Sequence, residues 1–243
     1  MTRDKKIRID KLLANNGYGS RKQVKQLIRD KRVKLGKQVI EDAGFLVAQS
    51  ELSLLTLDGQ SLTIYESPIF MLHKPAGYIT AMEDAKHPTI ADLIPPELQA
   101  IGLFPIGRLD KDTTGILLLT TDGTLCHQLL SPQRHVAKIY DVETEGSAWT
   151  PRDGEILAEG LRLFDGTECL PAELEIIDDS HVHLTIYEGK YHQVKKMAAA
   201  LFHPVTKLHR IHFAGIDLAP ELAVGDIRQL SAEEEAIVRE QVQ

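Results

Sequence analysis

Residues 107–123 read Gly-Arg-Leu-Asp-Lys-Asp-Thr-Thr-Gly-Ile-Leu-Leu-Leu-Thr-Thr-Asp-Gly, a polar loop that runs directly into an apolar segment. The apolar segment, residues 116–119, is short and continuous, which is typical of a strand buried in a sheet. A carboxylate on a loop anchored to such a strand is well placed for chemistry, because the strand fixes the position of the reactive group. Asp110, in the middle of this loop, is therefore the candidate catalytic carboxylate.

The order of residues in this loop resembles the signature loop of the RsuA/RluA-type RNA pseudouridine synthases. The shared pattern is Gly-Arg-Leu-Asp-x-Asp-Thr-Thr-Gly, then four apolar residues, then Thr-x-Asp-Gly. The resemblance implies an enzyme that isomerises uridine in RNA, with Asp110 as its catalytic aspartate and Arg108 in contact with the RNA. The residue types are compatible with three roles for Asp110: attack on the sugar, attack on the base, or removal of a sugar proton.

Two segments outside the loop resemble further motifs of this family. Residues 73–77, His-Lys-Pro-Ala-Gly, resemble its Lys-Pro-x-Gly turn with His in place of Asn, which implies that Lys74 and Pro75 shape the floor of the cleft. Residues 138–140, Lys-Ile-Tyr, resemble its Lys-x-Tyr motif, which implies that Tyr140 stacks on the target base. An aromatic face suits a base that has been turned out of an RNA helix, since stacking restores part of the free energy lost.

A third segment, residues 189–197, reads Gly-Lys-Tyr-His-Gln-Val-Lys-Lys-Met and resembles the family motif that carries a base near the catalytic aspartate. The resemblance implies that Lys195 pairs with Asp110, where a cation would keep the carboxylate ionised inside a pocket. His192 precedes Lys195 by three residues, so we expect both on one face of a helix, with His192 available to RNA.

The last resemblance is at residues 208–210, Leu-His-Arg, and implies that Leu208 packs against the site while Arg210 supports it or contacts RNA. No cofactor follows from any of these motifs. The 10 histidines and 2 cysteines contain no His-x-x-x-His and no Cys-x-x-Cys spacing, so we expect no metal. His181 and His183 share one face of a predicted strand, which is weak evidence for a metal site.

Charge is distributed unevenly along the chain. The 243 residues have a formal net charge of −7, yet residues 1–37 contain 13 Lys or Arg and only 3 Asp. This division indicates a basic module that contacts a polyanion, attached to a larger acidic body. Apolar spacing predicts helices over residues 7–15 and 21–31. The second helix carries a basic stripe suited to phosphates, made of Lys22, Lys25 and Arg29.

The pattern after these helices predicts a hairpin over residues 32–40 and a strand over 52–57. Two helices followed by strands resemble the S4 RNA-binding domain. We therefore expect an S4 domain at 1–62, a linker at 63–68 and a catalytic domain at 69–243. The resemblance implies an α+β fold in which the catalytic domain is a mainly antiparallel mixed β-sheet flanked by helices.

Composition sets limits on where the protein works. With 43% hydrophobic and 26% charged residues, the chain has the make-up of an ordinary globular protein. Its first residues lack an apolar core of the signal-peptide type, and no apolar run approaches the roughly 20 residues that span a membrane. We expect a cytoplasmic monomer whose partner is ribosomal RNA or a pre-ribosomal particle.

The choice of substrate rests on resemblance within the family. The S4 module, the compact length and the wording of residues 189–197 are most similar to the enzymes that modify small-subunit 16S rRNA, with large-subunit 23S rRNA as the alternative. A non-catalytic rRNA-binding or ribosome assembly factor is an alternative of another class, disfavoured because Asp110, Tyr140 and Lys195 occur together. A phosphotransferase with an Asp-x-Asp-x-Thr loop is also disfavoured, because its apolar strand should precede the loop.

Overall fold

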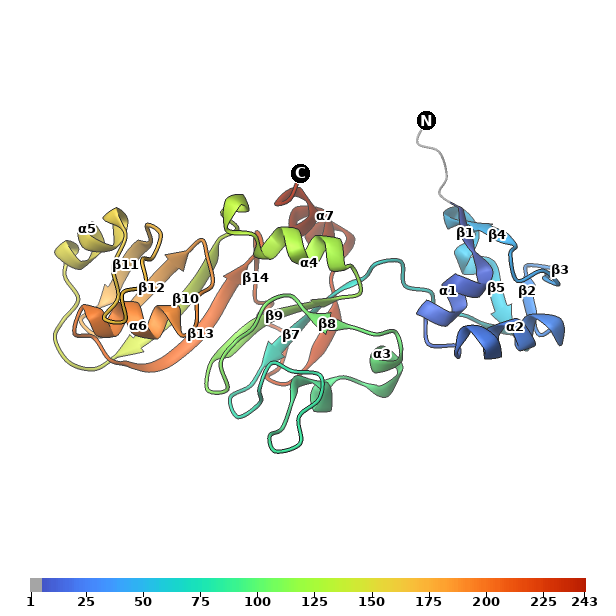
Figure 1. The fold of residues 1–243 in the computed structure, drawn as a ribbon, viewed down its shortest axis with the longest axis horizontal. Helices are drawn as coiled ribbons and strands as arrows, with labels where there is room; N and C mark the ends of the chain where they lie inside the picture. The colour runs from blue at the N-terminus through green and yellow to red at the C-terminus, as the bar shows by residue number, and fades with distance from the viewer. Residues whose placement is uncertain (1–5) are drawn as a thin grey trace. The chain divides into compact units, whose positions relative to one another are not determined.

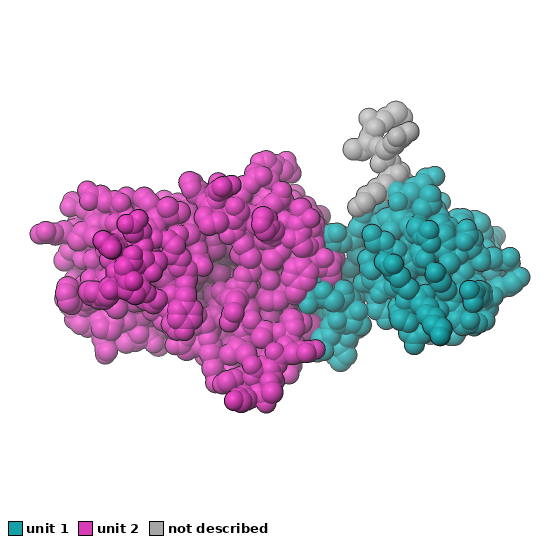
Figure 2. Space-filling model, in the orientation of Figure 1, with its two compact units in different colours: residues 1–67, 95–103 teal, residues 68–94, 104–243 magenta. Residues whose placement is uncertain are grey.

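The computed structural model describes residues 6–243, which divide into two compact units, coloured separately in Figure 2. Unit 1 runs to residue 67 and also includes residues 95–103, whereas unit 2 comprises residues 68–94 and 104–243. Within the described residues, every helix is too short or too polar to cross a membrane.

Unit 1 contains two α-helices packed on short strands, followed by a third helix from later in the chain. Its elements are β1 (Lys6–Arg8), α1 (Ile9–Asn15), α2 (Arg21–Arg29), β2 (Val33–Leu35), β3 (Gln38–Val39), β4 (Leu46–Ala48), the 3-10 helix η1 (Gln49–Leu54), β5 (Leu55–Leu57), β6 (Gln60–Ser61) and α3 (Pro96–Ala100) (Figure 1). The two predicted helices and the hairpin are present. The strand predicted over 52–57 is wrong in its first half, where the chain forms η1 instead.

The helix α2 shows why this part of the sequence folds as it does. The Ser20 hydroxyl accepts a hydrogen bond from the Gln23 backbone N–H, while the Gln23 side chain accepts one from Ser20 N, which closes a capping box. Val24 and Ile28 are buried in the core of the unit. The basic stripe lies on the exposed side of α2, with Lys22, Lys25 and Arg29 all in solvent.

Unit 2 is built on a nine-stranded sheet. Its elements are β7 (Ile69–Lys74), η2 (Ile90–Leu93), β8 (Phe104–Pro105), β9 (Thr114–Thr120), α4 (Gly123–Leu130), η3 (Pro132–Arg134), β10 (Lys138–Thr144), α5 (Pro151–Glu159), β11 (Glu173–Asp178), β12 (His181–Ile186), α6 (Gln193–Ala200), β13 (Val205–Phe213), β14 (Ile216–Asp217), β15 (Ile227–Gln229) and α7 (Ala232–Glu240).

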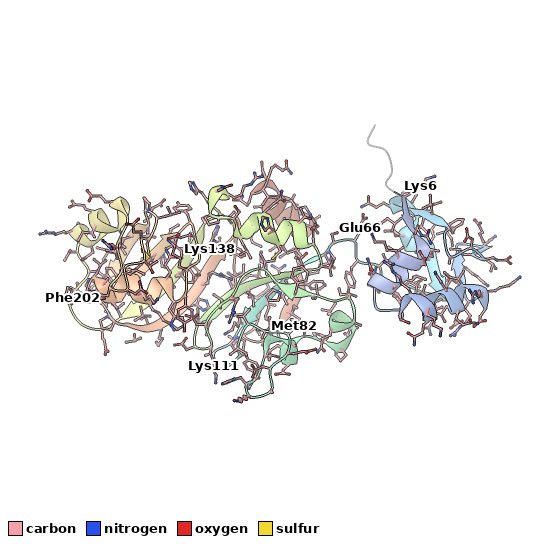
Figure 3. All side chains as sticks on the ribbon, viewed as in Figure 1. Lys6, Glu66, Met82, Lys111, Lys138 and Phe202 are labelled. Atoms are coloured by element: carbon pink, nitrogen blue, oxygen red, sulfur yellow. The ribbon has the colours of Figure 1, made fainter. Side chains whose placement is uncertain are left out.

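The strand order of this sheet is β11-β12-β10-β13-β9-β7-β15, with β14 beside β13 and β8 beside β9. The strands β13 and β9 pair in parallel, whereas the other pairs are antiparallel. This arrangement confirms the predicted α+β class with a mainly antiparallel mixed sheet. Lys138 begins β10 and Lys111 lies on the loop before β9 (Figure 3). The candidate site residues therefore lie on the central strands β10, β13 and β9 and the loop before β9.

The apolar run 116–119 forms a buried strand, as its pattern predicts. Ile116 and Leu118 of β9 are fully buried and pack with Ile69 and Met71 of β7. Side chains of α4 and α7, which Figure 1 draws over the same strands, complete this core. A capping box at Ser231 starts α7.

Gly115 makes the parallel contact between β9 and β13 possible. Its φ of +109° is a conformation that side chains rarely adopt, and a Cβ atom there would lie 2.2 Å from the carbonyl oxygen of Arg210. The two residues are paired in the sheet register. The glycine before the apolar run is therefore needed to bring β13, with its Arg210, against the loop that carries Asp110.

Candidate active site

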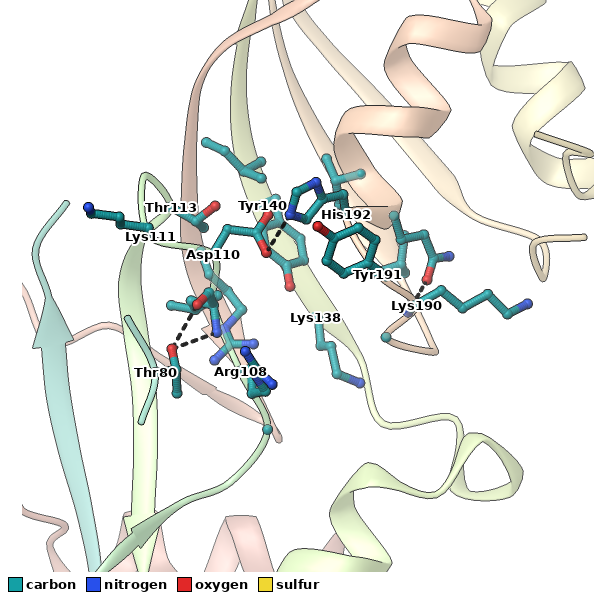
Figure 4. Close-up of a pocket in the computed structure, with 18 of the residues that line it drawn as sticks. Thr80, Arg108, Asp110, Lys111, Thr113, Lys138, Tyr140, Lys190, Tyr191 and His192 are labelled. Carbon is teal, nitrogen blue, oxygen red and sulfur yellow. Dashed lines mark hydrogen bonds and ion pairs between the residues drawn. The ribbon is translucent and has the colours of Figure 1, made fainter. Parts of the chain in front are cut away.

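A cavity of about 570 Å³ opens in unit 2 at the start of β9, beside the middle of β10 and the N-terminus of α6 (Figure 4). Its walls combine charged, aromatic and aliphatic side chains. The residues that line it are Ile79, Thr80, Gly107, Arg108, Leu109, Asp110, Lys111, Thr113, Leu130, Lys138, Tyr140, Ile186, Gly189, Lys190, Tyr191, His192, Gln193, Val194, Leu208 and Arg210. The volume is that of a site for a small ligand or a single nucleotide.

The loop that carries Asp110 is held from below by a buried lysine. Lys74 is 0% exposed, and its ammonium donates hydrogen bonds to the backbone carbonyls of Pro75 (3.0 Å), Asp110 (3.0 Å) and Thr113 (2.8 Å). Burial lowers the pKa of Lys74 to about 8. Because these partners are neutral carbonyls, Lys74 fixes the backbone of the loop rather than a carboxylate.

A threonine holds the other side of the loop. The hydroxyl of Thr80 donates to the carbonyl of Leu109 at 2.7 Å and accepts from its N–H at 3.0 Å, as the dashed lines in Figure 4 mark. The N–H of Gly77 donates to the carbonyl of Lys111 at 2.7 Å. The loop is thus bound through its backbone at several points, so the Asp110 side chain is free to face the cavity.

Two basic side chains from the α6 region approach the Asp110 carboxylate. His192 Nε2 lies 3.5 Å from Oδ1, and Lys195 Nζ lies 3.5 Å from Oδ2. Lys195 is closer to Asp112, at 2.5 Å from its Oδ1, and this contact holds the pKa of the Asp112 carboxyl below its usual range. Lys195 therefore bridges two carboxylates of the loop. The half-buried Asp110 carboxylate remains accessible from the cavity.

His192 reaches Asp110 from a position that helix periodicity does not predict. It is the residue that caps the N-terminus of α6 and has a left-handed backbone with φ of 54°. The expectation that His192 and Lys195 share a helix face is therefore wrong, although both contact Asp110. The exposed ring of Tyr191 stacks on His192 with 3.9 Å between the ring centres at the mouth of the cavity.

Tyr140 and Arg210 form the opposite wall. They are paired across β10 and β13, and the guanidinium carbon of Arg210 lies 6.0 Å from the centre of the Tyr140 ring. Leu208, two residues before Arg210, lines the same wall and is 7% exposed. A flat ring, an aliphatic side chain and a carboxylate therefore surround one space, which can hold a planar base against Tyr140.

The structure brings most of the predicted site residues into one place. Six of them line the cavity: Arg108, Asp110, Tyr140, His192, Leu208 and Arg210. Lys195 contacts Asp110 from beside the cavity, and Lys74 and Pro75 lie beneath the loop. The basic stripe on α2 belongs to unit 1.

Residue patterns give little warning of two further cavity residues. Thr80 lies in a segment without a regular pattern, and its role becomes visible only through its bonds to Leu109. Lys138 is 6% exposed, although lysine is rarely buried without a partner. The signal for Lys138 is its spacing of two from Tyr140, since alternate residues of a strand point to the same face.

One group of side chains outside the cavity has the make-up of a metal site. Ligand atoms of Asp141, His181 and His183 all lie within 4.8 Å of one another. His181 Nε2 makes a short contact with Asp141 Oδ1, and His183 Nδ1 lies 3.1 Å from Glu175 Oε2. Because Asp141 follows Tyr140 in β10, this group faces the other side of the sheet. None of these three residues is among those that line the cavity.

With this geometry in place, comparison with known proteins identifies the class. Residues 68–200 match the family described as RNA pseudouridylate synthase, and residues 7–52 match the S4 domain. The chain belongs to the RNA pseudouridylate synthase family and combines its catalytic domain with an S4 domain. The resemblance of the loop motifs is confirmed.

Similar proteins match over nearly the full length of the chain. An uncharacterised RNA pseudouridine synthase, YtzG of Bacillus subtilis, is 41% identical over 96% of this chain and 99% of its own. Ribosomal small subunit pseudouridine synthase A of Escherichia coli K12 is 39% identical over 96% of this chain and 100% of its own. A crystal structure of a pseudouridylate synthase, 36% identical, has a TM-score of 0.67 over 96% of this chain and 99% of its own.

Proposed function

We propose that this RNA pseudouridine synthase isomerises one uridine of small-subunit 16S rRNA, with Asp110 as the catalytic carboxylate. The observation that carries the proposal is the cavity in which Asp110 faces Tyr140, with His192 and Lys195 against the carboxylate. The choice of 16S rRNA is supported by relatives named ribosomal small subunit pseudouridine synthase A. Large-subunit 23S rRNA is the alternative substrate.

The reaction exchanges one bond between sugar and base for another. The bond from N1 of uracil to C1′ breaks, and its electron pair leaves with the base. The base turns within the cavity, C5 bonds to C1′, the proton on C5 is lost and N1 gains a proton. Atoms and electrons balance within the nucleotide, so no redox partner or energy source is needed.

Each wall of the cavity has a part in this sequence. Tyr140 stacks on the uracil after it leaves the RNA helix. Asp110 acts at the sugar or the base while bonds change, and Lys195 and His192 stabilise its negative charge. Arg108, exposed at the edge of the cavity, holds the distorted RNA backbone. Lys74 and Pro75 keep the loop of Asp110 in place, and Leu208 packs under the base.

We assign RNA anchoring to unit 1. Its basic stripe, Lys22, Lys25 and Arg29, is solvent-exposed and spaced for phosphate contacts. We place the division between the RNA-binding and catalytic domains at the segment 63–68. The protein is expected to act as a cytoplasmic monomer on rRNA or on a pre-ribosomal particle, without cofactor or metal.

Pseudouridine mapping by carbodiimide-blocked primer extension tests this function. Bacterial small-subunit and large-subunit rRNA are treated in EDTA with the protein, with Asp110→Asn and with Asp84→Asn as the matched control, an exposed aspartate of unit 2 outside the cavity lining. We expect one new stop in the small-subunit RNA for the protein and for Asp84→Asn, and none for Asp110→Asn. A stop only in large-subunit RNA would move the substrate to 23S rRNA. Bound RNA without any stop would contradict the enzymatic proposal.

A further inference from the structure

Two cations are buried in the wall of the cavity behind Tyr140. Lys138 is 6% exposed and Arg210 is 2% exposed, and both line the cavity. They lie on one face of the sheet, since Lys138 is two residues from Tyr140 and Arg210 is paired with Tyr140 across the strands. Figure 4 shows the Lys138 side chain extending away from Asp110, on the side of the view where Arg108 lies.

The hydrogen bonds of these cations leave donors free. Lys138 Nζ donates to the carbonyl of Val136 at 3.1 Å, and Arg210 Nε donates to the carbonyl of Ile116 at 2.9 Å. Arg210 Nη2 is buried and has no hydrogen-bond partner. A buried donor without a partner costs free energy, so its persistence in the wall of a cavity points to a ligand that completes it.

Carboxylates do not neutralise these charges. Within residues 6–243, neither Lys138 nor Arg210 has an ion-pair partner, and Arg210 itself helps to lower the pKa of Lys138. The buried Glu188 acts on Lys138 from a distance. Its oxygens are engaged elsewhere, by Lys190 at 2.8 Å and by the side-chain amide of Gln193 at 2.9 Å.

One aromatic ring supports both cations. The ring centre of Phe213 lies 5.4 Å from Lys138 Nζ and 4.7 Å from the guanidinium carbon of Arg210. Contact with a ring face compensates only part of the cost of burying a charge. Two like charges held together in this way define a site of positive potential that opens into the cavity.

We propose that Lys138 and Arg210 form a binding site for a negatively charged oxygen of the target nucleotide. The inference rests on the proposed function and adds a second charged centre to it, separate from Asp110 and its basic partners. Its ligand is an anionic oxygen, and the nucleotide offers two sources. One is the phosphate on the 5′ side of the target; the other is the uracil itself, whose oxygens share the negative charge while the base is detached from the sugar.

The first test compares four proteins on the same substrate RNA under single-turnover conditions. Lys138→Gln keeps length and a donor without charge, Lys138→Arg keeps the charge, and Lys207→Gln removes an exposed lysine of β13 as the matched control. We expect Lys138→Gln to lose about 100-fold in rate or affinity, Lys138→Arg to recover most of it, and Lys207→Gln to match the unmodified protein. Unchanged activity of a folded Lys138→Gln would overturn the proposal.

The second arm separates the two sources of charge. A substrate RNA with a methylphosphonate on the 5′ side of the target lacks the negative oxygen at that phosphate. If the phosphate is the ligand, Lys138→Gln binds the ordinary RNA more weakly than the unmodified protein does. On the methylphosphonate RNA the two proteins then bind equally. If the uracil is the ligand, Lys138→Gln lowers the rate at saturating RNA, and this loss is the same on both RNAs. If Lys138→Gln lowers the melting temperature together with the activity, and Lys138→Arg restores neither, Lys138 has a structural role only.

A third measurement requires no change at Lys138. The 13C NMR titration of the Lys138 side chain is followed in Asp110→Asn protein, with and without substrate RNA, and a Lys138→Arg sample assigns the signal. An anionic oxygen at Nζ raises the pKa of Lys138 above its free value. The base stays attached to the sugar in Asp110→Asn, so only the phosphate can supply the negative charge in this measurement. If the pKa is unchanged although Asp110→Asn still binds the RNA, the phosphate is not the ligand. If Asp110→Asn does not bind RNA at all, the proposed function fails first.

Discussion

Lys74 is a fully buried cation whose ammonium contacts backbone carbonyls of the loop that carries Asp110. Its position makes the backbone of this loop dependent on a side chain that does not contact the Asp110 carboxylate in the proposed active site. Lys74 holds the loop through charge-assisted hydrogen bonds to the carbonyls of Asp110 and Thr113, in addition to the bonds that Thr80 and Gly77 make to it.

Replacement of Lys74 by methionine should therefore harm both stability and rate. The buried carbonyls lose their donor, which costs roughly 1–3 kcal/mol for each one left unsatisfied. We expect a lower free energy of unfolding by urea and a lower single-turnover rate at saturating RNA. Lys86→Met, an exposed lysine in the same part of the chain, is the control. A Lys74→Met protein with unchanged rate would show that the loop is held without this contact.

The pH dependence of RNA binding follows from Lys138. Burial lowers the pKa of Lys138 to about 8, with Arg210 acting in the same direction and Glu188 opposing it. The positive charge is present below this pH and is lost as the pH rises through it, so wild-type affinity or rate should fall between pH 7 and 9. Lys138→Arg stays charged over this range and should show a smaller fall, because Lys74, whose pKa is also about 8, still titrates there in both proteins. Parallel pH profiles of the two proteins would contradict a role for the Lys138 charge.

At the scale of elements, the parallel pairing of β9 with β13 positions the site, because it brings Arg210 of β13 against the loop that precedes β9. The contact depends on Gly115, whose missing Cβ leaves room for the carbonyl of Arg210.

Gly115→Ala tests this pairing of β9 with β13. The substitution combines a strained φ with a backbone overlap, so we expect a loss of roughly 3 kcal/mol or more in the free energy of unfolding. Gly123→Ala, at the first residue of α4 and with open space around it, should be neutral or slightly stabilising. Equal unfolding midpoints for the two variants would rule out the close approach of the strands.

Element types were predictable wherever the pattern is local. The apolar run 116–119 predicts the strand β9, and the apolar spacing over residues 7–15 and 21–31 predicts the helices α1 and α2. The 3-10 helix η1 was missed, because its leucines match a strand pattern equally well. The position of His192 was also missed, since a left-handed cap interrupts the helical spacing on which the expectation rests.

The candidate site was predictable in part for the same reason. Asp110, Tyr140 and Lys195 lie in motifs that resemble a known family, so their convergence could be expected without coordinates. The burial of Lys138 and Lys74 could not, because lysine is normally exposed and only the packing of β7, β10 and β13 encloses these two. The hydrogen bonds between Thr80 and Leu109 depend on the path of an irregular loop, which the periodicity of the sequence does not predict.

At the scale of the whole molecule, charge separates the two functions. The first 37 residues carry 13 Lys or Arg and 3 Asp in a chain whose formal net charge is −7. RNA is thus attracted to one part of the chain and repelled by most of the other, apart from the cationic wall and edge of its cavity.

This division predicts a separable effect on binding. The combined change Lys22→Gln, Lys25→Gln and Arg29→Gln should weaken RNA affinity and reduce the slope of log affinity against log salt by about 2 to 3. The rate at saturating RNA should stay unchanged, because these residues lie in unit 1. Arg152→Gln, an exposed charge on α5, is the control. An unchanged salt slope would remove the basic stripe from the RNA interface.

Release of tritium from RNA labelled at C5 of uridine tests most directly whether Asp110 catalyses pseudouridine formation. Bonding of C5 to C1′ expels the C5 hydrogen, so each pseudouridine formed releases one tritium into water. We predict one tritium per target RNA for the unmodified protein and for the exposed control Asp84→Asn, and a rate at least about 1,000-fold lower for Asp110→Asn. Equal release by Asp110→Asn would contradict catalysis by Asp110, and no release by the unmodified protein on RNA that it binds would contradict the proposed activity.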